Sequence, residues 1–340
     1  MPVLPRPVLP RLWRRPRYVA RGGEQVHAHP ITGHGCRVLA FSVPASRAAL
    51  AQLCDRDFAG PSGGRVRLEP IGDRVLCVVA RFDELGSSDP VDGPKGWTAE
   101  TDVAFWVPVA RVGRVSRRLA QRVGWYLPWV FVDVPWATIA GREALGLAKQ
   151  VAAIDIADDD AGLASLRVST DVLHHYDPRS RVSTRPVLEI ERGQTVPSPP
   201  SLMEFARSVL GSQRVPTNRS GRALLPGLGL ARQLVEVGLR RRLPLMTLKQ
   251  FRDAADPWRA CYQAVLECPC RVRTIYEHGP MLHRYRLAVH HHDSHPIARE
   301  LGIVGAGGDT GTTHVELEPG WQMRFDFDFE RGKELWRARG

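Results

Sequence analysis

The sequence predicts an α+β fold that is rich in antiparallel strands, and three observations support this. Short valine-rich and aromatic segments recur along the chain and are separated by glycine and proline, as in a sheet or barrel of consecutive strands. Helical patterns are few and do not alternate regularly with strands, which disfavours a parallel sheet. Apolar residues make up 43% and charged residues 24% of the 340 residues, so a fully disordered or collagen-like chain is excluded.

The first half of the chain is expected to contain mostly strands. A short helix over 45–54 has Ser46 near its N-terminal cap. Arginines at helical spacing predict a second, basic helix over 111–124. Strands are predicted at 38–43, 65–68, 74–81, 103–109, 129–134 and 151–156.

The second half of the chain also contains short strands and a few helical patterns, and it does not repeat the sequence of the first half. Helical patterns cover 201–210, 228–239 and 248–255, and strands are predicted at 166–172, 185–191, 261–267, 282–290, 312–317 and 321–329. The glycine run over 302–311 invites a nucleotide-binding interpretation, but a β-branched segment follows it where dinucleotide binding needs a helix. A hairpin loop is therefore predicted there.

The N-terminus differs from the rest in composition. Residues 1–22 contain arginine and proline at high density and no acidic residue, and so many prolines oppose the amphipathic helix of a transit peptide. We expect a disordered basic arm over 1–22 and a single domain over 23–340. The chain has no apolar stretch of membrane length, few cysteines and no secretory signal, which predicts a soluble, cytoplasmic protein with no membrane partner.

The net charge of +11 favours anionic partners, and most of the positive charge is arginine, because only four of the 47 basic residues are lysine. The arginine stripe over 111–122 and the triplet Arg240–Arg242 are the segments that suit phosphate binding. Interleaved aromatic residues and a known reading motif are missing from the sequence, so nucleic acid is kept only as a further alternative partner.

Histidine and cysteine clusters raise the question of a metal site. Neighbouring histidines in the run His290–His295 point to opposite faces of a strand, although His290 or His292 is left free to face a pocket. Cys268 and Cys270 lack a second pair at zinc-site spacing. We therefore expect neither a metal nor an organic cofactor.

Lys149 is the sharpest chemical feature. It lies in a long apolar run, with no acidic residue between Glu143 and Asp155 to pair with it locally. Burial disfavours the ammonium form, so it lowers the pKa of a lysine and supplies a nucleophilic amine for Schiff-base chemistry. The alternative is a lysine whose stem packs on the core while its ammonium group reaches solvent.

The segment Ala140–Lys149, which reads AGREALGLAK, resembles the signature of the acetoacetate decarboxylase family. In that family a Gly-Arg-Glu sequence precedes the Schiff-base lysine after a short apolar stretch. Upstream, Trp97–Glu100 and Trp106–Val109 resemble the family's aromatic-Thr-Glu segment and its Pro-Val ending. Outside these segments the similarity is weak, although the order of elements from about Cys36 onwards is compatible with the family.

The resemblance implies a cone-shaped antiparallel barrel with flanking helices, usually oligomeric, and a carboxy-lyase that acts on acetoacetate or a related β-keto acid. Lys149 would form the imine, Glu100 or Asp102 would carry protons, and Arg142 and Glu143 would position the lysine. Gln150 stands where the family commonly has a second lysine, so we expect activation of Lys149 to rest on burial, helped by Arg142.

Further departures leave other functions open. The family's substrate-facing arginine has no secure match, although Arg37 is close, and a second family carboxylate falls near Cys77. The alternatives are an imine-dependent aldolase or dehydratase and a non-catalytic, ligand-binding member of the same fold. The enzyme interpretation requires that the Lys149 amine is dry and is not held in a plain ion pair.

Overall fold

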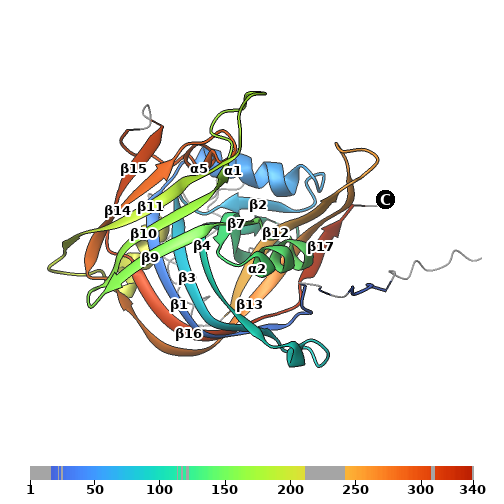
Figure 1. The fold of residues 1–340 in the computed structure, drawn as a ribbon, viewed down its shortest axis with the longest axis horizontal. Coiled ribbons are helices and arrows are strands. Elements are labelled where there is room, and N and C mark those ends of the chain that lie inside the picture. Colours follow the sequence, from blue (N-terminus) through green and yellow to red (C-terminus); the bar gives the residue numbers. More distant parts are fainter. Residues whose placement is uncertain are drawn as a thin grey trace, which may run out of the picture.

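The computed structural model describes residues 17–338 except 22, 24–25, 113, 116–117, 120–121, 211–241 and 308–310. Most of its elements are strands, and they form two large sheets (Figure 1). The ten-stranded sheet contains β1 (Ile31–Pro44), β2 (Arg67–Pro70), β3 (Arg74–Ser87), β4 (Trp97–Val112), β7 (Arg122–Val132), β8 (Lys149–Val151), β12 (Arg242–Arg252), β13 (Ala260–Pro280), β16 (Trp321–Phe329) and β17 (Lys333–Arg337). The five-stranded sheet contains β9 (Ala153–Asp159), β10 (Gly162–Val172), β11 (Ser183–Thr195), β14 (His283–His290) and β15 (Thr312–Leu317).

The larger sheet runs in the order β2-β4-β3-β1-β16-β13-β12-β7-β8, and β17 also pairs with β13. A further pairing joins β7 back to β4, so seven strands pair in a continuous ring. Most pairs are antiparallel, as predicted, but β7 pairs in parallel with β12 and with β8. The sheet is therefore mixed, and the prediction of a purely antiparallel sheet is wrong in these two pairs, since the chain crosses over before it enters β8 and β12.

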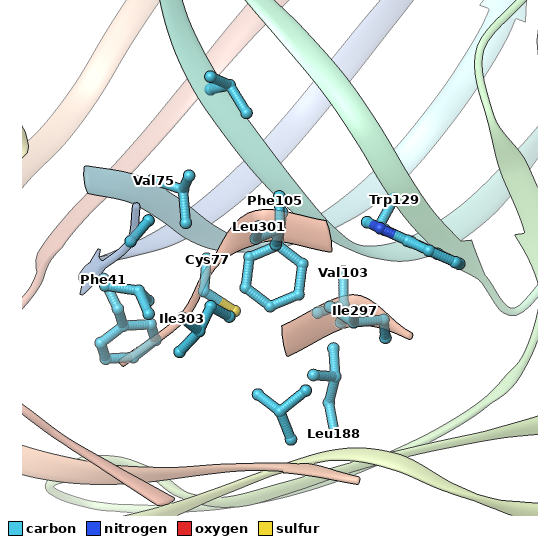
Figure 2. Packing of buried hydrophobic residues seen from close by; sticks show 14 of the residues in the cluster. Phe41, Val75, Cys77, Val103, Phe105, Trp129, Leu188, Ile297, Leu301 and Ile303 are labelled. Carbon is cyan, nitrogen blue, oxygen red and sulfur yellow. The ribbon is translucent and has the colours of Figure 1, made fainter. Parts of the chain in front are cut away.

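Strands β1, β3, β4 and β7 of the ring each have one face in a core cluster that they share with the smaller sheet. Val103 and Phe105 of β4 belong to a core cluster that also contains Leu188 of β11, and Figure 2 shows these side chains packed together. Ile297 and Leu301 close the same cluster. Because side chains alternate along a strand, the even-numbered residues of this part of β4 point the other way.

Short helices flank the sheets. They are α1 (Arg47–Cys54), α2 (Pro135–Ala140), α3 (Leu202–Leu210) and α5 (Ile297–Leu301), together with the single turns η1 (Asp55–Ala59), η2 (Gly93–Lys95) and η3 (Gly141–Leu145). Ser46 caps α1 as predicted, since its side chain accepts a hydrogen bond from Ala49 N at 3.4 Å. The structure also confirms the predicted helix over 201–210 and the strand after the glycine run.

Two predicted helices are strands. In place of the basic helix over 111–124, β4 runs to Val112, the two-residue strands β5 (Arg114–Val115) and β6 (Arg118–Leu119) follow, and β7 begins at Arg122. The segment 248–255 falls largely in β12, which pairs with β13 along its length. In both places pairing between strands decides the structure. The predicted helix over 228–239 lies outside the described residues, as do Arg240 and Arg241.

Most of the predicted arm also lies outside the described residues. Residues 17–21 form neither helix nor strand, and Tyr18 Oη donates a hydrogen bond to Glu143 Oε1 at 3.0 Å. Among the described helices, none has the length and apolar character needed to cross a membrane.

Candidate active site

An apolar cavity of about 430 Å³ lies against the face of the ring that is turned away from the smaller sheet. Its lining comes from every strand of the ring, from α2 and η3, from His27 and His29, and from residues 95–98. Lys149, Glu100 and Asp102 all contribute to this lining. The three residues that the sequence selected for chemistry therefore meet in one cavity, although 49 residues separate Lys149 from Glu100.

Strand alternation explains why both carboxyl groups reach the cavity. Glu100 and Asp102 are two positions apart on β4, so they share a face, while Val103 packs into the core on the other face. The sequence left these two acids as alternatives for one role. The structure brings both of them into the cavity with Lys149. Cys77, near which a second family carboxylate was expected, is buried in the core cluster.

The segment from α2 to β8 positions Lys149. Its backbone pairs in parallel with Val130 of β7, and Arg142 donates a hydrogen bond from Nη1 to Lys149 O at 3.1 Å. Gly141 leaves room for the lysine stem, because a Cβ atom at this position would lie 2.7 Å from Lys149 Cδ. This contact gives a steric reason for the glycine of the Gly-Arg-Glu sequence.

Side chains of strand β12 also hold the segment from α2 to β8. Thr247 Oγ1 donates a buried hydrogen bond to Leu145 O at 2.6 Å, and Lys249 Nζ donates to Ala144 O at 3.2 Å. Gly146 turns the chain with φ of +70°, and a Cβ atom there would collide with the Lys249 backbone. The backbone of the segment that precedes Lys149 is therefore held by side-chain hydrogen bonds as well as by sheet pairing.

The Lys149 amine is largely removed from solvent, but it is paired. Its side chain is 12% exposed, and Nζ forms a short ion pair with Glu100 Oε1, whose side chain is 3% exposed. The expectation of an unpaired amine is wrong, because the partner comes from a distant strand that local sequence does not show. A buried carboxylate stabilises the ammonium, so the amine has to lose its proton before it can act as a nucleophile.

Asp102 differs from its neighbour. Its carboxyl lines the cavity, and burial raises its pKa to about 7. The Lys149 ammonium lowers this pKa by less than burial raises it, and the charges of Glu100 and Asp133 add smaller increases. Near neutral pH this carboxyl can therefore exist both with and without its proton. Such a group can both give and take a proton.

The other predicted site residues lie outside the cavity lining. Glu143 accepts the hydrogen bond from Tyr18. Gln150 points away from its neighbour Lys149 and accepts from His295 Nε2 at 2.7 Å, so it does not replace the family's second lysine in the cavity. Arg37 lies between Cys36 and Val38, which both line the cavity, and alternation turns it to the opposite face.

The histidine and cysteine clusters have other contacts. His290 Nε2 lies 2.8 Å from Glu189 Oε2, and His292 Nε2 lies 2.9 Å from Pro186 O, so neither lines the cavity. Within the described ranges, no group of three or more His, Cys, Asp or Glu side chains is arranged to hold a metal ion.

Sequence reasoning missed the aromatic side of the cavity. Phe325, Phe327 and Phe329 alternate with aspartates on β16 and line the cavity, and Trp97, Trp106 and Trp136 line it elsewhere. The alternation was a visible signal for an apolar face, and it predicted the strand. It did not show that this face meets Lys149.

Comparison with protein-family models gives no match, and comparison with curated proteins gives none either. Solved structures do match. The acetoacetate decarboxylase of Legionella pneumophila subsp. pneumophila str. Philadelphia 1 has a TM-score of 0.58 at 13% identity, with 95% of this chain and 92% of that chain covered. A second acetoacetate decarboxylase structure has a TM-score of 0.54 at 12% identity, with 94% of each chain covered. The similarity extends over nearly the whole length of these chains and is a similarity of fold.

Proposed function

We propose that this chain, which has the acetoacetate decarboxylase-like fold, is a Schiff-base lyase that acts on a β-keto acid through Lys149. The observation that carries the proposal is the meeting of Lys149, Glu100 and Asp102 in one apolar cavity. Cavities of about 300–1,000 Å³ with a few converging polar groups are the usual form of small-molecule sites. The ring of strand pairs would then be the wall of the cone-shaped barrel that the sequence resemblance implies.

The ion pair gives the first step. Glu100 accepts the proton from the Lys149 ammonium, which leaves a neutral amine beside a neutral carboxylic acid. In an apolar cavity this transfer removes two buried charges, so the surroundings favour it more than water would. Glu100 is in this view the base that prepares the nucleophile.

The amine then adds to the ketone carbon of the substrate and forms a carbinolamine. Asp102 protonates the departing hydroxyl, water leaves, and a protonated imine remains. The bond to the carboxylate breaks, carbon dioxide leaves, and the electron pair moves to the imine nitrogen as an enamine forms. Glu100 returns its proton to the enamine carbon, and water hydrolyses the imine to release the ketone and Lys149. The cycle takes up one proton from solvent in total.

A second candidate is a ligand-binding member of the fold without catalysis. The ion pair favours it, because a lysine that only neutralises Glu100 would look the same at rest. The two candidates differ in whether Lys149 ever forms a covalent bond to a carbonyl compound.

Borohydride trapping separates them. The protein is incubated with acetoacetate, pyruvate or a longer β-keto acid, reduced with borohydride, and digested for mass mapping. We expect an adduct on Lys149 and release of carbon dioxide from the β-keto acids. No adduct with any of them, from a protein with an intact circular dichroism spectrum, would support the binding function instead.

Two variants sharpen the test. Lys149→Arg keeps the positive charge but forms no imine, so trapping should disappear. Lys95→Arg is the matched control, because Lys95 also lines the cavity but its ammonium is paired with Asp92. Glu100→Gln tests the base: we expect trapping to slow by about 100-fold, in the range for general base catalysis. Faster trapping would mean that Glu100 only restrains the lysine.

A further inference from the structure

The cavity extends well beyond its reactive end. Trp97 lies at the start of β4 and is 62% exposed, while Glu100 lies three residues further along the same strand. At about 3.3 Å per residue, roughly 10 Å separate this exposed tryptophan from the ion pair. A ligand as small as acetoacetate at Lys149 would leave most of the volume of about 430 Å³ to water.

The walls beside and beyond the charged groups are apolar and aromatic. Phe82 is the register partner of Glu100, and Phe325, Phe327 and Phe329 of β16 line the cavity as well. The Phe82 and Phe327 rings meet edge to face with their centroids 5.6 Å apart, and Phe325 and Phe327 meet in the same way at 6.0 Å. The sheet register sets Phe329 opposite Cys270 of β13. Such edge-to-face groups are favourable neighbours for a further aromatic ring.

The two histidines of the lining, His27 and His29, pack against aromatic rings. The imidazole of His27 packs edge to face on Trp136 at 5.1 Å, and that of His29 packs on Phe329 at 5.8 Å. Burial lowers the pKa of His29 to about 4, with help from the positive charges of Lys249 and Arg331, so its ring is neutral at physiological pH. Burial also lowers the pKa of His27.

Charge is confined to the reactive end and to Lys95, whose ammonium is paired with Asp92. The chain is rich in arginine, yet no arginine is among the described residues that line the cavity. A carboxylate far from Lys149 would thus be buried without a guanidinium partner, which is unfavourable.

We infer that the substrate of this site carries a bulky apolar body, aromatic at its far end, that extends from Lys149 along the phenylalanine side of the cavity toward Trp97. The inference rests on the proposed imine chemistry and narrows its substrate class. Short keto acids that lack such a body should be poor substrates.

The test compares two β-keto acids with the same reacting group, acetoacetate and 3-oxo-5-phenylpentanoate, by borohydride trapping on Lys149 over a range of concentrations. We expect half-maximal trapping at a concentration at least 10-fold lower for the phenyl compound. Equal trapping, or better trapping of acetoacetate, would overturn the inference and leave the imine chemistry standing. No trapping of either would overturn both.

A cavity variant tests where the body lies. Cys270→Phe places a ring on β13, beside Leu243 and Phe329, and β13 is three strand pairs from β8 in the order of the sheet. We expect it to abolish the 10-fold preference for the phenyl compound over acetoacetate. Cys261→Phe is the matched control, because Cys261 is an exposed thiol on the same strand and does not line the cavity. If Cys270→Phe keeps the preference and its fold, the body does not lie along this wall, and the inference is wrong.

Discussion

Replacement of Asp102 by Asn should change how stability depends on pH. The unfolded chain loses this proton near the ordinary aspartate pKa of 3.8, whereas the folded protein holds it to about pH 7. Because the folded pKa is raised, the folded state binds more protons than the unfolded state between these values. The carboxyl therefore destabilises the fold progressively as pH rises through this window, and the penalty is constant above about pH 7.

The magnitude follows from the size of the shift. Each pKa unit corresponds to about 1.4 kcal/mol, and about two units of the window lie above pH 5. Between about pH 5 and pH 8 the wild-type free energy of unfolding should thus fall by about 3 kcal/mol more than that of Asp102→Asn, which has no proton to lose. At pH 8 the variant should be the more stable protein.

Urea denaturation at several pH values measures this difference. Asp160→Asn is the control, because Asp160 is exposed in the turn between β9 and β10, and its curve should run parallel to the wild type. The reasoning is refuted if Asp102→Asn also runs parallel to the wild type, since Asp102 would then titrate alike in the folded and unfolded states.

Three other substitutions test the site. Lys149→Met should lower the free energy of unfolding by about 3 kcal/mol in urea denaturation, because it leaves Glu100 buried and unpaired, and adding Glu100→Gln should recover most of the loss. Gly141→Ala should slow borohydride trapping about 10-fold, because the new Cβ displaces the stem of Lys149. Its stability should change little, since the backbone of Gly141 is helical and accepts alanine. Gly279→Ala is the control: this glycine has open space around it, so trapping by this variant should equal that of the wild type. Thr247→Val should cost about 2 kcal/mol in urea denaturation, because a buried carbonyl loses its donor.

The positions of most strands along the chain could be read from the sequence, because the alternation of side chains with a period of two is a local signal. The segments that were read wrongly carry a local pattern that also fits a helix. Over 111–124 the arginines recur every three to four residues, yet Arg111 and Arg122 face each other across the β4–β7 pair. The segment 248–255 lies largely in β12, whose strand partner is β13, and no local pattern in the sequence predicts this pairing.

The site shows the same division. Lys149 could be found because an apolar run and a Gly-Arg-Glu sequence both mark it. Glu100 could be found from the aromatic-Thr-Glu segment that it ends, and Asp102 by counting back from the Pro-Val pair. The ion pair could not be predicted, because it joins β8 to β4 through the intervening strand β7. The composition of the cavity wall could not be predicted either. Residues of β16 and of β8 line the same cavity only because β7 pairs with β4 and completes the ring of strands.

The carboxyl of Asp102 distinguishes a catalytic site from a site in which Lys149 and Glu100 form only an ion pair. One lysine neutralises one carboxylate, so a lysine kept only to balance Glu100 gives no reason for Asp102 beside it. Asp102 instead lowers the stability of the fold at neutral pH, and burial holds its pKa near 7, the value that suits a group that gives and takes protons. A costly group placed beside an amine, in a cavity that a carbonyl compound can fill, is what imine formation and hydrolysis require. If Asp102→Asn traps β-keto acids as fast as the wild type and only gains stability, this argument for catalysis fails.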